Sequence, residues 1–242
     1  MRDEEGVTVF VPVFNEEGLL ETNTLRLRAL LASLELPYEI ILGSNGSVDG
    51  TVPMGERLSR RYGEIRFFHL TRKGVGSAFK KGVTMARYGR IVTMDMDLSV
   101  HMKFIPEACR LLESYDVVIG SKITGSQNRP RIRRLASTAF IRLAGVLLRI
   151  HFHDYSIAAK GYRKALIEEY LPLLNDKTFY VVEILYRARH DGMRLKEIPV
   201  QCSDMRESRF NLAHEGIHKF GHLFGLWLRN GIERTPRPSG DP

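Results

Sequence analysis

The chain is poor in cysteine and tryptophan, and it lacks any long apolar run. Its two cysteines, Cys109 and Cys202, stand far apart without metal-ligand spacing, which argues against both a disulfide framework and a cysteine zinc site. No segment approaches the roughly 18 consecutive apolar residues of a membrane-spanning helix. The N-terminal residues lead directly into a strand pattern and lack the apolar region of a signal peptide. We therefore expect a cytoplasmic protein in a reducing setting, with no transmembrane helix.

Positive charge is the feature of the composition that carries most information. Lysine and arginine together number 36 against 28 acidic residues, which gives a net charge of +8 and a pI of about 9.6. Such a surplus attracts phosphates, nucleic acid or an acidic membrane surface. No nucleic-acid-binding motif accompanies the charge, so we do not expect a nucleic-acid partner. The 43% hydrophobic and 26% charged residues are typical of a globular protein.

Apolar runs alternate with helical patterns through the first 94 residues. Strands are expected at residues 7–13, 38–43, 65–70 and 89–94, and helices at residues 16–33, 49–62 and 76–87. This alternation predicts an α/β fold with a mostly parallel sheet and helices on both faces. Ligands of such Rossmann-like sheets lie at the carboxyl ends of the strands.

The second half of the sequence is less regular. A strand at residues 116–120 is followed by a polar, basic stretch at 121–131. Beyond it we expect helices at residues 132–149, 163–174, 181–190 and 213–230, and strands at residues 156–161 and 195–200. No internal repeat or linker divides the chain.

Two carboxylates, Asp95 and Asp97, stand one residue apart at the exit of the fourth expected strand. Like charges this close are unfavourable when buried unless a cation neutralises them. The ordinary alternative is that they cap the turn into a helix, where aspartate is common. Their place after three strand–helix units favours a metal site, because Mg²⁺ and Mn²⁺ prefer carboxylate oxygens and bridge to phosphates.

Two other segments follow strands and begin helices. The segment at 45–51 forms a turn in which Ser47 or Asp49 is expected to cap the next helix, and a helix start also offers free N–H groups to a phosphate. The basic, glycine-rich segment at 72–78 lacks the full P-loop or dinucleotide spacing. At this position it could still support a nucleotide.

Charged residues in the second half have two interpretations each. Positive charge at a helix start opposes the helix dipole, so the basic cluster near residue 131 indicates either a bound anion or a solvated helix start; it comprises Arg129, Arg131, Arg133 and Arg134. Asp154 and Glu183 are isolated acids that either position one of the basic residues or act as a general base. The last helix has an apolar face, which indicates a core or dimer face or an interfacial helix at a membrane; it comprises Ile217, Phe220, Phe224, Trp227 and Leu228.

Taken in order, these segments resemble the family 2 inverting glycosyltransferases with the GT-A fold. Within that family the chain looks most like the dolichyl-phosphate mannose and glucose synthases. The resemblance rests on residues 12–17, 45–51, 73–78, 95–99, 120–122, 134–137, 154, 183–188, 197–200 and 206–210. It covers roughly residues 7–230. It implies one GT-A domain over residues 1–234, with a nucleotide-sugar-binding half (7–120), an acceptor half (121–212), an amphipathic helix (213–231) and a tail (235–242).

The resemblance also assigns roles to residues. Asp95 and Asp97 would bind the metal and the donor diphosphate. The nucleotide-sugar site would comprise Pro12, Phe14, Asn15, Glu16, Asn45, Lys73, Gly76, Asp95, Met96, Asp97 and Arg209. The catalytic set, which binds the acceptor phosphate and the leaving diphosphate, would comprise Asp95, Asp97, Lys122, Arg134 and Arg206.

Four residues depart from the family pattern. Ser44 and Asn45 stand where the family usually has two aspartates, the first of which often helps to hold the nucleotide base. Ser99 replaces a glutamine that is common in mannose synthases, and this is nearer the glucose-synthase form. Lys122 stands where arginine is frequent, which keeps the charge but loses the bidentate fork.

We therefore expect an enzyme that moves mannose or glucose from GDP-mannose or UDP-glucose to polyprenyl or dolichyl phosphate, with inversion and with Mg²⁺ or Mn²⁺. It would act as a peripheral protein at the cytosolic face of a membrane. Two alternatives stay open. One is the same fold with a soluble or protein hydroxyl acceptor, which needs a base such as Asp154 or Glu183. The other is a degenerate nucleotide-sugar-binding protein. The sequence assigns no oligomeric state.

Overall fold

The structure is a computed structural model. It describes residues 5–127, 131–155, 157–203 and 220–228, with backbone only for residues 123–127 and 131–138. The chain forms two compact units. The sheet unit comprises Met1–Asn128 and His153–Met205, and the helical unit comprises Arg129–Phe152 and Arg206–Pro242. The predicted single domain with two halves and a tail is not tested by this division into units and stays a prediction.

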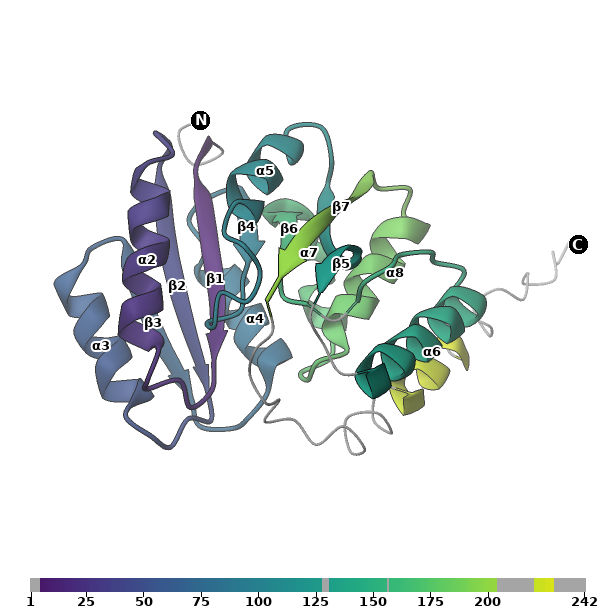
Figure 1. Ribbon diagram of the computed structural model, residues 1–242, viewed down its shortest axis with the longest axis horizontal. Helices are drawn as coiled ribbons and strands as arrows, with labels where there is room; N and C mark the ends of the chain where they lie inside the picture. The colour runs from purple at the N-terminus through teal and green to yellow at the C-terminus, as the bar shows by residue number, and fades with distance from the viewer. Residues whose placement is uncertain (1–4, 128–130, 156, 204–219, 229–242) are drawn as a thin grey trace, which may run out of the picture. The chain divides into compact units, whose positions relative to one another are not determined.

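One mixed sheet organises the sheet unit. Its strands are β1 (Val7–Val13), β2 (Tyr38–Asn45), β3 (Ile65–Leu70), β4 (Arg90–Thr93), β5 (Val117–Gln127), β6 (Lys160–Arg163) and β7 (Leu195–Cys202). They lie in the order β3-β2-β1-β4-β6-β5-β7 (Figure 1). Only β6 runs antiparallel, to both β4 and β5. The predicted α/β class with a mostly parallel sheet is confirmed.

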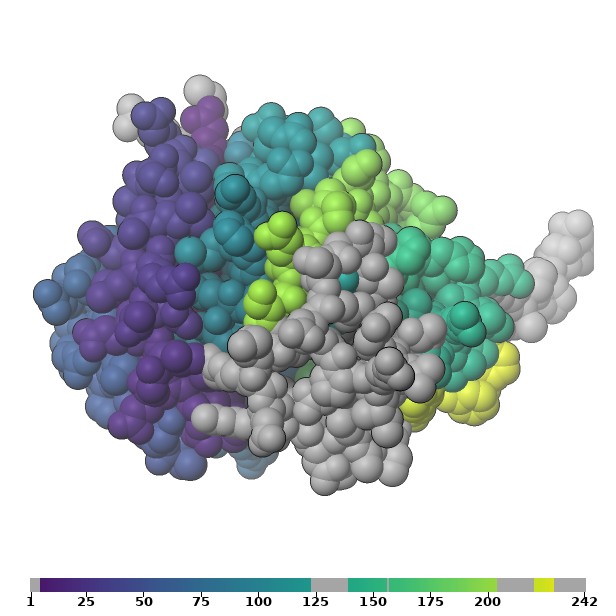
Figure 2. Space-filling model, in the orientation of Figure 1, coloured from purple at the N-terminus to yellow at the C-terminus, as the bar shows by residue number. Residues whose placement is uncertain are grey.

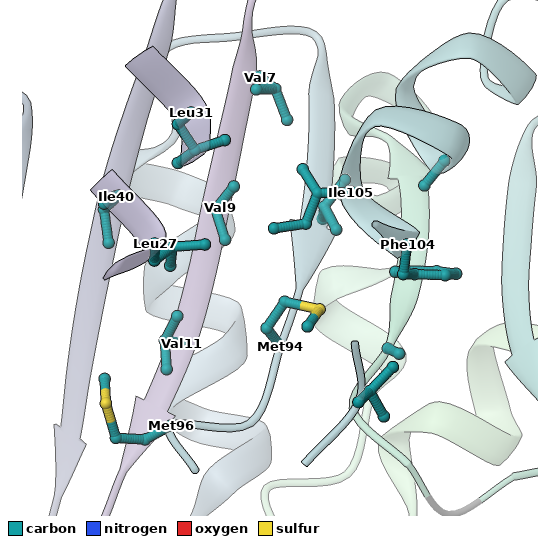
Figure 3. Packing of buried hydrophobic residues seen from close by; sticks show 14 of the residues in the cluster. Val7, Val9, Val11, Leu27, Leu31, Ile40, Met94, Met96, Phe104 and Ile105 are labelled. Atoms are coloured by element: carbon teal, nitrogen blue, oxygen red, sulfur yellow. The ribbon is translucent and has the colours of Figure 1, made fainter. Parts of the chain in front are cut away.

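Helices cover both faces of this sheet. The sheet unit contains α2 (Leu20–Ala32), α3 (Thr51–Arg61), α4 (Val75–Met85), α5 (Phe104–Leu111), α7 (Lys164–Tyr170), the 3-10 turn Leu171–Leu173 and α8 (Tyr180–His190). On one face, Val9 and Val11 of β1 pack with Leu27 of α2 and Ile105 of α5 (Figure 3). Alternate residues of a strand point to opposite faces, so Phe10 packs on the other face.

The second face is aromatic. The Phe10 ring lies 6.0 Å from Phe79 of α4, centroid to centroid, and Phe79 stacks on Tyr180 of α8 at 4.6 Å. The Tyr162 ring of β6 lies 5.7 Å from the Phe79 ring in an edge-to-face arrangement. Such ring pairs contribute beyond simple burial. The predicted placement of helices on both faces is therefore confirmed.

The helical unit contains α6 (Arg131–Leu148) and a helical segment at residues 220–228, which run side by side (Figures 1 and 2). Phe140 and Phe220 join them edge to face at 5.6 Å. The predicted helix at 213–230 is confirmed over residues 220–228; its other residues, Ile217 included, lie outside the described part. The predicted apolar face is exposed, by 39–52%; it comprises Phe220, Phe224, Trp227 and Leu228. No helix among the described residues is long and apolar enough to span a membrane.

Two predicted strand boundaries were wrong, and one helix was not predicted. Strand β5 continues to Gln127, where a polar stretch was expected from Ser121, because this segment pairs with β7 across an irregularity between Ser121 and Ser126. Strand β6 begins at Lys160, four residues later than predicted, because its pairing with β4 starts only opposite Thr93. Helix α5 is absent from the predicted elements.

Candidate active site

The chain reverses its strand order between β1 and β4. From β1 it builds β2 and then β3 on one side, and it returns to place β4 on the other. Open α/β sheets bind ligands in the crevice beyond the carboxyl ends at such a point. Strand β1 ends at Val13 and β4 at Thr93, so Asn15 and the acid pair flank this point. The predicted position of these segments at the carboxyl ends is confirmed.

Asn15 connects the loop after β1 to the loop after β2. Its backbone has a φ of +54°, a left-handed conformation that asparagine tolerates better than most residues. Its N–H donates to Ser47 Oγ at 3.1 Å, and its Oδ1 accepts the Val48 N–H at 2.9 Å. Asn45 adds a third link, because its Nδ2 donates to the Val13 carbonyl at 3.0 Å. These bonds hold the two loops as one wall.

The next residues extend this wall to α3. The Glu16 N–H donates to Thr51 Oγ1 at 2.8 Å. Asp49 Oδ1 accepts the Thr51 N–H at 3.0 Å, but the N-cap of α3 is Gly50 and no side chain caps it, so the predicted capping by Ser47 or Asp49 was wrong. Ser44, at one of the departures from the family pattern, is buried, and its hydroxyl lies 3.0 Å from both Ser47 Oγ and His69 Nδ1.

Lys73 and Phe14 bring the third loop to the same edge. The Lys73 ammonium lies 3.9 Å above the centre of the Phe14 ring, within the range of a cation–π interaction. Gly46 allows this approach: it has a φ of +81°, and a Cβ there would lie 3.0 Å from Lys73 N. Pro12 pairs in register with Gly43 just below these loops. The predicted crevice residues from β1, β2 and β3 therefore lie close together.

Gly76, predicted to support the nucleotide, packs against backbone. A Cβ at this position would lie 2.1 Å from the Asn175 carbonyl oxygen and 2.7 Å from that of Lys177. The next residue, Ser77, donates its N–H to the Asp176 carbonyl at 3.1 Å. The start of α4 is thus fixed against the loop at residues 175–177, and the role of Gly76 toward a nucleotide stays a prediction.

Replacing Gly76 with alanine separates these two roles. We expect Gly76→Ala to lower the free energy of unfolding by about 3 kcal/mol, because the new methyl group overlaps backbone atoms that cannot move independently. Urea denaturation measures this. Gly63→Ala is the matched control, since a Cβ there meets nothing within 4 Å. Unchanged stability with weaker nucleotide binding would instead assign Gly76 to the ligand.

The segment carrying the acid pair alternates between core and crevice. Met94 and Met96 are buried in the core (Figure 3), and the intervening Asp95 and Asp97 are only partly buried. Asn23 of α2 anchors this segment by donating Nδ2 to the Met96 carbonyl at 2.9 Å. The alternation explains how two carboxylates can follow a buried strand without entering its core.

A tight turn follows the acid pair. Leu98 adopts a φ of +50°, which is strained for a residue with a branched side chain. Its N–H donates to the Asp95 carbonyl at 3.0 Å, and the Ser99 N–H donates to Asp97 Oδ1 at 2.9 Å. Aspartate thus closes a turn here, as the ordinary alternative predicted, while leaving other carboxylate oxygens for a ligand.

Asp95 lies in a field that opposes its ionisation. Burial and the neighbouring Asp97 carboxylate raise the pKa of Asp95 to about 6, although a hydrogen bond from the Ala158 N–H and the charges of Lys122 and Lys160 act in the other direction. A cation at this site would remove the cost of the second negative charge.

The acid pair fits a hard divalent cation that shares its ligands with a substrate. Among the described residues, no group of three or more histidine, cysteine, aspartate or glutamate side chains gathers to hold a metal. Two carboxylates alone suit Mg²⁺ or Mn²⁺, which keep several waters and take phosphate oxygens as further ligands. The donor set therefore fits a metal that binds together with a diphosphate.

A buried ion pair lies near the acid pair. Lys122 and Asp154 are 2% and 0% exposed, and Lys122 Nζ lies 3.4 Å from Asp154 Oδ2. Asp154 thus pairs with a basic residue of the predicted set, but this residue is a lysine and not an arginine. A buried carboxylate needs such a partner because an unpaired buried charge is costly. Glu183 accepts the Asn175 N–H at 2.5 Å.

Lys160 is absent from the predicted site, yet it lies near Asp95 and Asp154. It is fully buried. Burial lowers the pKa of its ammonium to about 8, against the attraction of Asp154, while Lys122 lowers it further. The signal in the sequence is a lysine flanked by two alanines and a glycine inside an expected strand.

The remaining predicted residues fall outside the described side chains. Arg134 lies on α6, whose backbone alone is described there, and Arg206 and Arg209 lie outside the described residues. The predicted cationic basin stays a prediction.

Comparison with known proteins identifies the family. The model of glycosyl transferase family 2 matches residues 8–171. The chain belongs to that family. The resemblance to family 2 glycosyltransferases inferred from its motifs is confirmed.

Relatives of this family 2 glycosyltransferase include three named proteins. Glycosyltransferase AglD of Haloferax volcanii is 27% identical over 230 residues, which cover 91% of this chain and 37% of AglD. The dolichyl-phosphate hexose transferase of the same organism is 30% identical over 155 residues, 63% of this chain and 67% of the relative. The undecaprenyl-phosphate 4-deoxy-4-formamido-L-arabinose transferase of Pseudomonas aeruginosa is 29% identical, over 76% of this chain and 55% of the relative. This chain thus spans 37–67% of the length of these relatives.

Solved structures place this family 2 glycosyltransferase in the GT-A fold. Glucosyl-3-phosphoglycerate synthase from Mycobacterium tuberculosis, in complex with Mn²⁺, UDP and glucosyl-3-phosphoglycerate, matches with a TM-score of 0.67 at 16% identity, over 94% of this chain and 80% of that one. The same enzyme with phosphoglyceric acid gives a TM-score of 0.69 at 14% identity. At this identity the likeness shows the fold alone, and the predicted GT-A fold is confirmed.

Proposed function

We propose that this protein transfers a hexose, with inversion, from a nucleotide diphosphate sugar to polyprenyl or dolichyl phosphate. The observation that carries the proposal is the acid pair beyond β4, at the reversal of strand order and beside the interlinked loops of β1, β2 and β3. The names of two relatives support the acceptor, since both are transferases of polyprenyl-type phosphates. Family membership supports the reaction class.

The donor would lie across the carboxyl ends of β1 and β4. In this arrangement the loops that contain Asn15, Asn45 and Lys73 hold the nucleotide, and Asp95 and Asp97 face its diphosphate. A divalent cation, Mg²⁺ or Mn²⁺, would neutralise charge that develops on the departing diphosphate. Mn²⁺ and UDP occur together in the similar fold of glucosyl-3-phosphoglycerate synthase, which is consistent with this division of roles.

The chemical step is a displacement at the anomeric carbon. An acceptor phosphate oxygen forms the new bond to that carbon as the bond to the donor diphosphate breaks, and the bonding electrons leave with the diphosphate. A phosphate monoester is anionic at neutral pH, so the acceptor needs no strong general base. Asp154 then serves to hold Lys122, whose positive charge can stabilise phosphate oxygens. Arg134, Arg206 and Arg209 are proposed to bind the same phosphates.

The helical unit is proposed to contact the membrane that holds the lipid acceptor. Its exposed apolar side chains at residues 220–228 are joined on α6 by Leu143 and Val146, which are 38% and 75% exposed. Exposed Arg142 and Arg149 lie on the same helix and the turn after it. Aromatic and aliphatic side chains beside basic ones are typical of surfaces that lie in the membrane interface.

An assay with labelled donors tests the proposal. GDP-mannose and UDP-glucose are each incubated with a short polyprenyl phosphate, with and without Mn²⁺. We expect label from one donor in a chloroform-extractable product, only with the metal. Asp97→Asn should abolish it, whereas Asp116→Asn should not, because Asp116 lies at the opposite edge of the sheet and pairs with Arg163 and Arg194.

Two outcomes would contradict the proposal. Label that appears only in a water-soluble product would favour a soluble acceptor. Absence of metal-dependent binding of either nucleotide in calorimetry would favour a degenerate binding protein. The departure from the family pattern at Ser44 and Asn45 is the reason for considering this alternative.

A further inference from the structure

Lys160 lies in the interior of the sheet, on a strand with a neighbour on each side. It opens β6 and stands opposite Thr93 of β4 and Ile119 of β5. Because Asp95 follows Thr93 by two residues, this register brings Lys160 to the base of the acid pair. A buried ammonium is costly unless it has polar or anionic partners, so its partners indicate what the lysine does.

The direct partner of the Lys160 ammonium is a carbonyl of its own turn. Nζ donates to the Ile157 carbonyl at 2.9 Å, and no carboxylate among the described residues lies within 4.0 Å to form an ion pair. The bond closes the turn formed by residues 157–160. The lysine ammonium has three N–H donors and no acceptor. This hydrogen bond uses one donor, and the positive charge also attracts the surrounding carboxylates.

The turn at residues 157–160 holds the acid pair from the side of β6. The Ala158 N–H donates to the Asp95 carboxylate, and the Ala158 carbonyl accepts the Thr93 hydroxyl. At the start of the turn, the Ile157 N–H donates to Asp154 Oδ1 at 3.4 Å. One short turn therefore contacts both Asp95 and the partner of Lys122.

We propose that Lys160 is a positioning residue for the donor site: its ammonium closes the turn at 157–160 and thereby holds the Ala158 N–H on Asp95. The positive charge of Lys160 also helps to hold the nearby carboxylates in place, since it attracts Asp95, Asp154 and Glu197. The inference rests on the proposed function, in which Asp95 faces the metal and the diphosphate. Residues that orient metal ligands from behind change metal affinity by about 10- to 100-fold when replaced.

Calorimetry of the full chain with UDP or GDP and Mn²⁺ tests this proposal. We expect Lys160→Met to weaken metal-dependent nucleotide binding by about 10- to 100-fold. Its melting temperature without ligand should be unchanged or higher, because a buried charge is removed. The KM for the acceptor should stay the same. A merely structural lysine would instead lower the melting temperature and leave nucleotide affinity unchanged.

Lys80→Met is the matched control. Lys80 also donates Nζ to a backbone carbonyl, that of Leu174 at 3.0 Å, and pairs with Asp176, but on α4; its loss should leave nucleotide affinity unchanged. If Lys160→Met does not fold, Lys160→Arg, which keeps the charge but not the shape, should weaken binding by a smaller factor. Wild-type affinity in the variant that folds overturns the role of Lys160 alone. Wild-type protein that binds neither nucleotide overturns the proposed function instead.

Discussion

Asp95→Asn is expected to reduce kcat/KM by about 10³-fold and, at the same time, to stabilise the ligand-free protein. The loss of rate follows from the proposed function, in which this carboxylate faces the metal and the diphosphate at the point where charge develops. The gain in stability follows because the pKa of Asp95 is raised to about 6 by burial and by Asp97. The folded protein therefore bears the cost of an ionised carboxylate at neutral pH.

The size of this gain in stability depends on pH. A carboxyl with a raised pKa contributes stability below its usual value of 3.8, and this contribution is lost as the pH rises to about 6. Asp95→Asn should therefore be more stable than the wild type by about 2–3 kcal/mol at pH 7.5, from about 1.4 kcal/mol per unit of pKa. The difference should vanish near pH 4. Denaturant unfolding without metal at the two pH values measures it.

Asp116→Asn provides the contrast. Its carboxylate lies within 3.6 Å of the guanidinium groups of Arg163 and Arg194 and accepts the Arg194 N–H at 2.8 Å, so its replacement should lower stability and leave activity intact. If Asp95→Asn were instead less stable than the wild type at pH 7.5, the main role of the carboxylate would be structural, as acceptor of the Ala158 N–H, and not metal binding.

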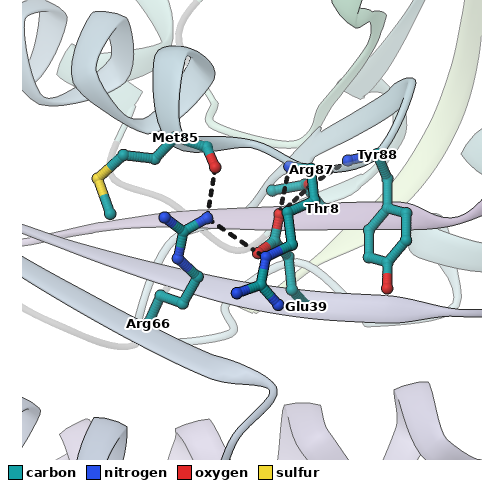
Figure 4. Close-up of polar contacts among 6 residues, drawn as sticks. All are labelled: Thr8, Glu39, Arg66, Met85, Arg87 and Tyr88. Carbon is teal, nitrogen blue, oxygen red and sulfur yellow. Dashed lines mark hydrogen bonds and ion pairs between the residues drawn. The ribbon is translucent and has the colours of Figure 1, made fainter. Parts of the chain in front are cut away.

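Glu39→Gln is expected to lower the free energy of unfolding by about 3 kcal/mol, because it breaks a buried ion pair. Glu39 is 1% exposed and lies at the amino end of β2 (Figure 4). Its carboxylate accepts the Thr8 hydroxyl at 2.8 Å, the Arg87 N–H at 2.6 Å and an Arg66 N–H at 3.3 Å. The glutamine side chain has an NH₂ group in place of one carboxylate oxygen. This NH₂ group would face one of the three groups that donate to Glu39, and that hydrogen bond would be lost.

The location of Glu39 predicts a selective effect. It joins β1, β2, β3 and the end of α4 at the edge of the sheet opposite the active site (Figure 4). The variant should therefore lose stability in urea denaturation while its KM for the donor stays unchanged. Glu107→Gln, which removes an exposed pair with Arg110 on α5, should change neither quantity, because exposed pairs contribute little. A changed donor KM in Glu39→Gln would indicate coupling between the two edges.

The half of the fold that carries the donor loops could be predicted closely from the sequence. The strands at residues 7–13 and 65–70 match the structure at both ends, because continuous apolar runs between turn residues define buried parallel strands. The positions of Asn15, Asn45, Lys73 and Asp95 followed directly, since strand ends in parallel sheets share one edge.

Strand β6 and the surroundings of Lys160 could not be predicted in the same way. Strand β6 has four residues, and its limits are set by β4 and β5, which are distant in sequence. Burial of Lys160 depends on that pairing, so nothing near it in the sequence states that its surroundings are Asp95 and Asp154. Helix α5 was missed because Pro106 resembles a helix breaker, although proline is tolerated in the first turn.

The antiparallel strand β6 also bears on how the chain folds during synthesis. Thr93 and Lys160 are 67 residues apart, so the parallel half leaves the ribosome with one side of β4 unpaired. An unpaired edge of an apolar strand invites association with other chains, and domains emerge in order from the N-terminus. Nascent chains that end before residue 160 should therefore be prone to aggregate. They would also carry the acid pair without the turn at residues 157–160, so under the proposed function they would not yet hold Asp95 ready to bind a donor.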